Sequence, residues 1–106
     1  MNVEHLREFV ALARSRNFTK TAHDLNLAQS TLSKHIAAME RELGFSLFDR
    51  SDRSVVLTDS GKALFESTVF ALEMLDKGIV KAKLLARAGT TPVRIGGYLQ
   101  IASITE

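Results

Sequence analysis

The chain has 106 residues, 45% of them apolar and 25% charged, and it contains no cysteine, which excludes disulfides and thiolate metal sites. No apolar run reaches the roughly 18 residues of a membrane-spanning helix, and the N-terminus lacks the layout of a signal peptide, so we expect a cytoplasmic protein of one small domain and an appendage. The formal net charge of +2 arises from residues 61–106, because residues 1–60 hold eight basic and eight acidic residues, so net charge gives little evidence for a nucleic-acid partner.

Three short helices are predicted in the first part of the chain. Apolar residues recur at helical spacing in residues 3–16, so we expect a first helix there, ended by Asn17. Thr19 is a good N-cap for a second helix over 20–25, because its hydroxyl can accept a hydrogen bond from a free backbone N–H. The third helix is expected over 29–43, before Gly44.

The third predicted helix has two different faces. One side is apolar, because large apolar residues recur at spacings of four, three and four: Leu32, Ile36, Met39 and Leu43. The other side has small and polar residues, which can approach DNA closely and bond phosphates or base edges; these are Ser30, Lys34, Ala37 and Arg41, flanked by Ser33 and Ala38. Periodicity alone fits an ordinary amphipathic helix with a solvated face equally well.

Residues 47–57 predict a β-hairpin, with two short β-prone runs on either side of a polar turn. Arg50 and Arg53 are the basic residues of this segment. An arginine near a hairpin tip suits a phosphate or a narrow minor groove. The alternative is that both arginines pair with Asp49 and Asp52 on a solvated loop.

Residues 59–88 predict one long helix, with Thr58 as its N-cap. About 30 residues at 1.5 Å each give a length of about 45 Å, which is more than a small domain can cover. A second copy of the chain is the simplest partner for the remaining apolar stripe. Gly78 either lets two helices approach closely or marks a bend. The candidate dimer contacts are Leu64, Val69, Leu72, Leu75, Ile79 and Leu84.

Residues 89–106 begin with Gly-Thr-Thr-Pro and continue with Val93 and Ile95 alternating with Arg94, which is a strand pattern. One strand and one helical turn cannot bury a core alone. We therefore expect a hinge and the start of a second domain that is cut short.

Two long stretches, LREFVALARSRNFTKTAHDLNLAQSTLSKHIAAMERELGFSLFDR and RSVVLTDSGKALF, resemble the N-terminal DNA-binding domain of the bacterial LysR-type transcriptional regulators. The resemblance implies a mainly α fold. It places a winged helix-turn-helix (three helices plus a β-hairpin wing) over residues 1–58 and a long linker and dimerisation helix over 59–88. Residues 89–106 would be the hinge and first strand of a truncated effector-binding domain.

By this resemblance the chain is a sequence-specific transcription regulator, which binds a partial inverted repeat in double-stranded DNA as a homodimer. Its recognition helix would be 29–43 and its wing 49–54. In the full-length family a tetramer and a contact with RNA polymerase are implied, and a small-molecule effector is expected only for the missing domain, so no cofactor is expected here. The implied DNA-binding residues are Thr19, Gln29, Ser30, Thr31, Ser33, Lys34, Arg50 and Arg53.

Individual roles follow from side-chain chemistry. Gln29 can pair through its amide with an adenine edge, and Arg53 matches an arginine that reads the minor groove. Lys34 stands where the family usually has Arg, and without the planar guanidinium fork a phosphate contact becomes the favoured role. Arg50 could equally be a phosphate contact or an internal strut.

The start of the third helix departs from the family pattern. Family members commonly have Ser-Gln-Pro where this chain has Ala28-Gln29-Ser30. Ala28 cannot cap the helix, and Ser30 lacks the fixed φ of proline. Either Ser30 or Thr31 supplies the cap, or the first turn frays until DNA binds.

Two other functions compete with DNA binding. Catalysis is not expected, because His5, His23 and His35 lack metal-ligand spacing and no nucleophile elbow or phosphate-binding glycine loop is present. The other alternative is a dimerisation module that sequesters a full-length regulator through the long helix.

Overall fold

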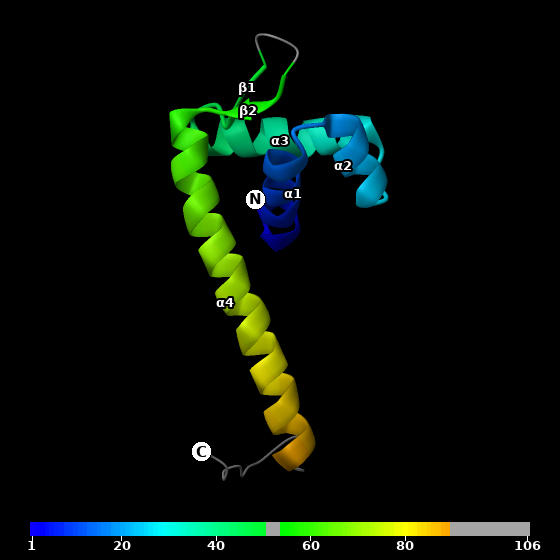
Figure 1. The fold of residues 1–106 in the computed structure, drawn as a ribbon, viewed down its shortest axis with the longest axis vertical. Helices are drawn as coiled ribbons and strands as arrows, with labels where there is room; N and C mark the ends of the chain where they lie inside the picture. Colours follow the sequence, from blue (N-terminus) through cyan, green and yellow to red (C-terminus); the bar gives the residue numbers. More distant parts are fainter. Residues whose placement is uncertain (51–53, 90–106) are drawn as a thin grey trace. The chain divides into compact units, whose positions relative to one another are not determined.

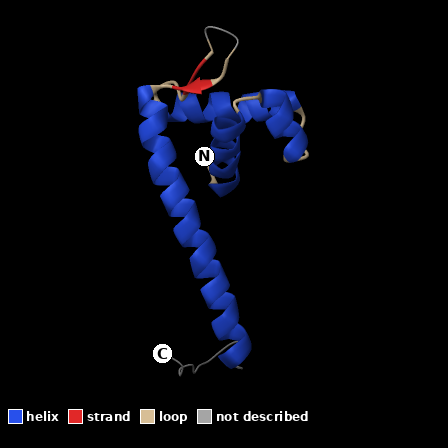
Figure 2. Cartoon of the chain, in the orientation of Figure 1, coloured by secondary structure: helices blue, strands red, loops and turns tan. Residues whose placement is uncertain are grey.

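The computed structural model describes residues 1–50 and 54–89, and these residues are mainly helical (Figures 1 and 2). This is the predicted order of three helices, a hairpin and a long helix. By the contacts between residues, the chain forms two units, with the boundary after Leu72. In chain order the elements are α1 (Val3–Ser15), α2 (Phe18–Asp24), α3 (Gln29–Leu43), β1 (Phe48–Asp49), β2 (Val56–Leu57) and α4 (Asp59–Gly89).

The core lies where α1 and α2 pack against each other and against α3. Phe9 of α1 is fully buried, and its ring meets Phe48 edge-on at 5.7 Å and Phe65 at 6.3 Å between ring centroids. From α3 the core takes Leu32, Ile36 and Met39, each at most 1% exposed. The predicted apolar face of α3 is therefore confirmed, and the burial of these side chains sets the rotation of the helix.

The boundary between α1 and α2 differs from the prediction. Arg16 ends α1 in the left-handed region, at φ 58°, and its N–H donates to the Leu12 carbonyl. Asn17 is extended and begins α2, because its side-chain Oδ1 accepts from the Lys20 N–H at 2.9 Å. The prediction that Thr19 is the N-cap is wrong, since Thr19 already lies inside the first turn. The side-chain amide of Asn17, two residues earlier, caps the helix instead, because its oxygen lies close to the free N–H groups of the first turn.

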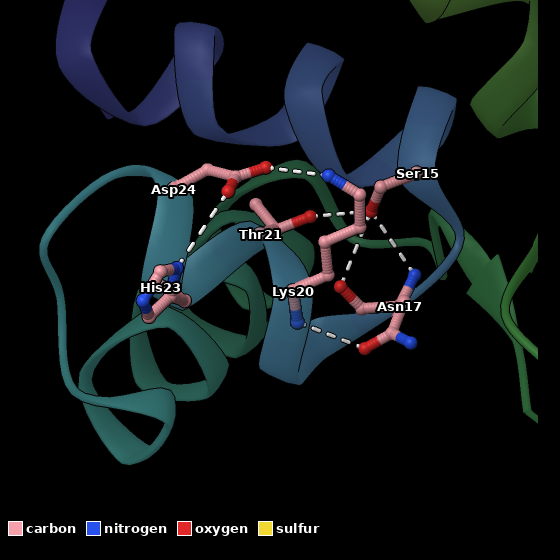
Figure 3. A network of polar contacts seen from close by, with 6 residues as sticks. All are labelled: Ser15, Asn17, Lys20, Thr21, His23 and Asp24. Carbon is pink, nitrogen blue, oxygen red and sulfur yellow. Dashed lines mark hydrogen bonds and ion pairs between the residues drawn. The ribbon is translucent and has the colours of Figure 1, made fainter.

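Polar side chains hold this α1–α2 turn, as Figure 3 shows. The Ser15 hydroxyl accepts from the Asn17 N–H at 3.1 Å and bonds the hydroxyl of Thr21, which is 2% exposed. Further along α2, the Lys20 ammonium lies 2.8 Å from the Asp24 carboxylate. The start of α2 is thus tied to the end of α1.

The hairpin joins α3 to α4 and packs on the core. β1 and β2 are antiparallel, with Phe48 opposite Leu57 and Asp49 opposite Val56. Thr58 follows β2 as the predicted cap of α4, because its Oγ1 accepts from the Gly61 N–H at 2.9 Å. The same hydroxyl donates to the Ser46 carbonyl at 2.7 Å. Thr58 therefore both caps α4 and holds the segment that leads into the hairpin.

The predicted dimer contacts on α4 fall into two groups. Leu72 is buried, and Leu64 and Val69 pack against the core. These three side chains are therefore part of the packing within a single copy of the chain. Three others are 41–58% exposed: Leu75, Ile79 and Leu84. Dimer contact through any of the six stays a prediction.

The helix continues unbroken through Gly78, and a Cβ built there would meet nothing within 4 Å. Among the described residues no helix combines the length and apolarity needed to cross a membrane. The strand expected at 93–95 lies outside the described residues.

Candidate nucleic-acid interface

The N-terminal half of α3 presents its polar residues to solvent. Gln29, Ser30, Ser33 and Lys34 are exposed, whereas Thr31 is half-buried. Because Leu32 and Ile36 are fully buried, α3 cannot rotate these polar residues away without exposing the core. The structure thus brings the predicted recognition residues of α3 together on one helix end.

Thr19 joins this surface from a different helix. Its Oγ1 donates a hydrogen bond to the Oε1 of Gln29, with 3.0 Å between the two oxygens. Both residues were predicted to contact DNA, but a bond between them was not expected. No local sequence signal could reveal it, since the two residues meet only because α2 packs against α3.

The first turn of α3 has no side-chain cap. Ala28 is the N-cap residue, with φ −69° and ψ 143°, and among the described residues no side chain caps the helix. The Thr31 and Leu32 N–H groups both donate to the Ala28 carbonyl, at 3.0 and 3.1 Å. A cap from Ser30 or Thr31 is therefore not observed, and fraying of this turn in free protein stays a prediction.

We expect Ala28→Ser to stabilise the free protein by about 1 kcal/mol, because a hydroxyl at this position can accept from the second or third N–H of the helix. Urea unfolding would measure the change, and hydrogen exchange should slow at Ser30 and Thr31. Ala38→Ser, in the middle of the same helix, is the control, which should give no gain. Unchanged exchange in Ala28→Ser would show that the first turn needs no cap.

Lys34 and Lys20 differ in whether an acidic side chain holds the ammonium group. Lys20 is held by Asp24, and hydrogen bonding from Lys20 is the largest of the causes that lower the pKa of the Asp24 carboxyl. Within residues 1–50 and 54–89, no ion pair joins Lys34 to an acidic group. Lys34 is therefore the lysine of this region that is free to contact a phosphate.

Arg50 contacts residues of two helices. Its Nη2 lies 3.6 Å from Oε1 of Glu40 on α3, and its guanidinium carbon lies 5.2 Å from the centre of the Phe18 ring on α2. Of its two predicted roles, the described contacts favour the internal one, although its side chain is 46% exposed. Arg53, the other predicted arginine, lies outside the described residues.

Glu40 was missed by the sequence prediction. One of its carboxylate oxygens, Oε2, accepts from the Leu47 N–H at 2.7 Å and from the Phe48 N–H at 3.3 Å. The other, Oε1, faces Arg50. Glu40 thus ties the first strand of the hairpin to α3. Residue spacing alone does not predict that a carboxylate will accept from two N–H donors seven and eight residues later in the chain.

The histidines have packing or surface positions. His35 of α3 bonds the buried Glu8 of α1, with 2.7 Å between Nδ1 and Oε1, and its ring lies 4.2 Å from the ring of His5. His23 is exposed beside Asp24. Among the described residues no group of three histidine, aspartate or glutamate side chains is placed to hold a metal ion.

Two curated relatives share much of this sequence. The chain is 40% identical over 96 residues to the HTH-type transcriptional regulator BudR of Klebsiella aerogenes. The aligned region covers 91% of this chain and 67% of that protein. The chain is also 41% identical over 87 residues to BudR of Raoultella terrigena, covering 82% of this chain. The chain spans only 30% of the length of that second relative.

Solved structures share the fold. The DNA-binding domain of BenM in complex with catB site 1 DNA superposes with a TM-score of 0.81 at 35% identity, over 83% of this chain and 95% of that one. Full-length BenM superposes with a TM-score of 0.74 at 36% identity, over 78% of this chain and 27% of that one. Residues 3–62 match the family model of the bacterial regulatory helix-turn-helix proteins, lysR family. The chain therefore belongs to the lysR family of bacterial regulatory helix-turn-helix proteins.

Proposed function

We propose that this chain is the DNA-binding part of a transcription regulator, and that α3 lies in the major groove of double-stranded DNA. The observation that carries the proposal is the division of α3 into a fully buried apolar face and an exposed polar end. Small hydroxyl and amide side chains at the start of a helix can reach base edges, and a lysine beside them can bind a phosphate.

The DNA-bound BenM domain supports this placement, because it has the same fold at 35% identity. In our proposal Gln29 and Ser33 contact bases, while Lys34 and the uncapped N–H groups of α3 bind phosphates and set the register. The hairpin would follow the backbone beside the groove. Arg50 supports this arrangement from inside, because it contacts both Glu40 and Phe18.

Two substitutions should separate base reading from phosphate binding. Gln29→Ala should cost about 1–3 kcal/mol at one base pair and relax the preference there. Lys34→Ala should weaken binding to all sequences and reduce the slope of log affinity against log salt by about 1. The measurements are titrations of selected and scrambled DNA sites over a range of salt concentrations.

Lys62→Ala is the matched control for Lys34→Ala, because it removes an exposed lysine from α4 instead of from α3. It should change the salt slope less than Lys34→Ala does. If neither Gln29→Ala nor Lys34→Ala changes DNA affinity, the assignment of this face of α3 to the groove is wrong.

We further propose that two copies of the chain pair through α4. Large apolar side chains after Leu72 are exposed along this helix, with Met74 at 50%, Val80 at 59% and Leu85 at 64% exposed. Exposed apolar area of this extent is unfavourable in water and favours association. Pairing would hold two copies of α3 at a fixed separation, so the DNA site should be a partial inverted repeat.

Sedimentation should therefore give twice the chain mass, and Ile79→Glu should shift the equilibrium to monomer by burying a charge in the interface. Lys77→Glu is the control, because it places a new carboxylate on the same helix two residues before Ile79, which is the opposite side of the helix, and removes no apolar side chain. It should remain dimeric. A monomer at high concentration in the unmodified protein would refute the proposed pairing.

A further inference from the structure

The amide of Gln29 is held at one end only. Its Oε1 accepts the hydrogen bond of the Thr19 hydroxyl at 3.0 Å, although both residues are exposed. Within residues 1–50 and 54–89, no hydrogen bond involves the side-chain nitrogen Nε2 of Gln29. The amide therefore has its oxygen turned toward α2 and both of its N–H groups available.

This orientation matters because a free glutamine side chain offers a donor and an acceptor interchangeably. Rotation of the terminal torsion is broad, so either atom can face a ligand. In the structure the Thr19 hydroxyl donates to Oε1, and this orientation leaves the N–H groups of the amide outward. In the opposite orientation the same hydroxyl would accept from Nε2–H, and the oxygen would face outward. The bond thus orders the Gln29 side chain before any ligand arrives, with its N–H groups outward in this structure.

We propose that Thr19 is a positioning residue that sets the base preference of Gln29 by holding its amide with the N–H groups outward. This inference rests on the proposed DNA-binding function. Two amide N–H groups that point outward match the major-groove edge of guanine, which has two acceptors, N7 and O6. They also match thymine, which has one acceptor, O4. They match adenine less well, since its major-groove edge pairs one acceptor with one donor, and they do not match the amino group of cytosine.

Sequence reasoning assigned Thr19 a role as a helix cap and as a DNA contact. The cap belongs to Asn17, whose Oδ1 accepts from the Lys20 N–H. Because Asn17 already supplies the cap, the Thr19 hydroxyl is left to bond Gln29. Its action on DNA would pass through that amide.

The first experiment uses the free protein. NMR relaxation of the Gln29 side-chain NH₂ should show an ordered amide in the unmodified chain and a mobile one in Thr19→Val, with unchanged backbone shifts along α3. Thr19→Ser keeps the hydroxyl and should retain the order. A mobile Gln29 amide in the unmodified protein would overturn the proposal, and this result needs no DNA.

The second experiment is in vitro selection of duplex DNA followed by titration. The position read by Gln29 is the one at which Gln29→Ala loses preference. The unmodified chain should select guanine or thymine there, and Thr19→Val should reduce that preference at least threefold, with Thr19→Ser close to unmodified. In a Gln29→Ala background, Thr19→Val should change affinity by less than twofold.

An equal effect of Thr19→Val in both backgrounds would mean that Thr19 contacts DNA itself, which overturns the positioning role. Selection of adenine by the unmodified chain would overturn the outward-donor orientation. Absence of any sequence-selective binding would instead refute the proposed function, while the NMR result would still decide whether Thr19 orders Gln29.

Discussion

Gly61→Ala is expected to destabilise the domain by about 3 kcal/mol, at the upper end of the cost of overpacking. A Cβ at this position would lie 2.2 Å from the Leu47 carbonyl oxygen and 3.1 Å from Cδ2 of Leu57. The Leu47 carbonyl cannot easily retreat, because it accepts from the Thr58 N–H at 3.0 Å. Urea unfolding at fixed protein concentration would measure the loss.

Gly78→Ala is the matched control for Gly61→Ala. Both glycines are helical residues of α4, but nothing lies within 4 Å of a Cβ built at Gly78. Alanine there should stabilise the helix by about 1 kcal/mol through helix propensity. If Gly61→Ala were as well tolerated as Gly78→Ala, the close contact between α4 and the hairpin entry would not exist in solution.

Most of the fold followed from periodicity and family resemblance. The apolar spacing of Leu32, Ile36 and Met39 predicted the buried face of α3, and these side chains are at most 1% exposed. The hairpin and the Thr58 cap were also correct. Such features depend on neighbours in sequence or on regular spacing, and that is the information that a single chain carries.

The errors concern choices between nearby residues. Asn17 and Thr19 are both good N-cap residues, and propensity cannot say which one the chain places in the extended conformation at the helix start. The α1–α2 turn decides it, because the left-handed Arg16 and the Ser15 hydroxyl place Asn17 at the cap. A boundary shift of two residues then releases the Thr19 hydroxyl for a different bond.

The candidate site was predicted as a set of residues but not as a set of contacts. Sequence placed Thr19, Gln29 and Arg50 on it, yet each of them bonds a residue from another element. Such partners are set by how α2, α3 and the hairpin pack, and no spacing rule encodes them. The predicted role of Arg53 remains a prediction, because that residue lies outside the described range.

Glu40→Ala should also cost about 3 kcal/mol, because it leaves two buried N–H groups, those of Leu47 and Phe48, without their acceptor, at about 1–3 kcal/mol each. Leu47 is fully buried and Phe48 is 4% exposed, so water reaches them poorly. Glu40→Gln should lose less, since its amide oxygen can still accept. Thermal and urea unfolding would rank the variants.

Glu42→Ala is the control for Glu40→Ala on the same helix. Its carboxylate is 56% exposed and pairs with the terminal ammonium of Met1 at 2.8 Å, a surface ion pair worth about 0–1 kcal/mol. Because Glu40 also faces Arg50, its removal should free that arginine and loosen the hairpin base against α3. DNA affinity measured well below the unfolding temperature should therefore fall in Glu40→Ala and not in Glu42→Ala. Equal stability of these two variants would show that Glu40 does not hold the hairpin to α3.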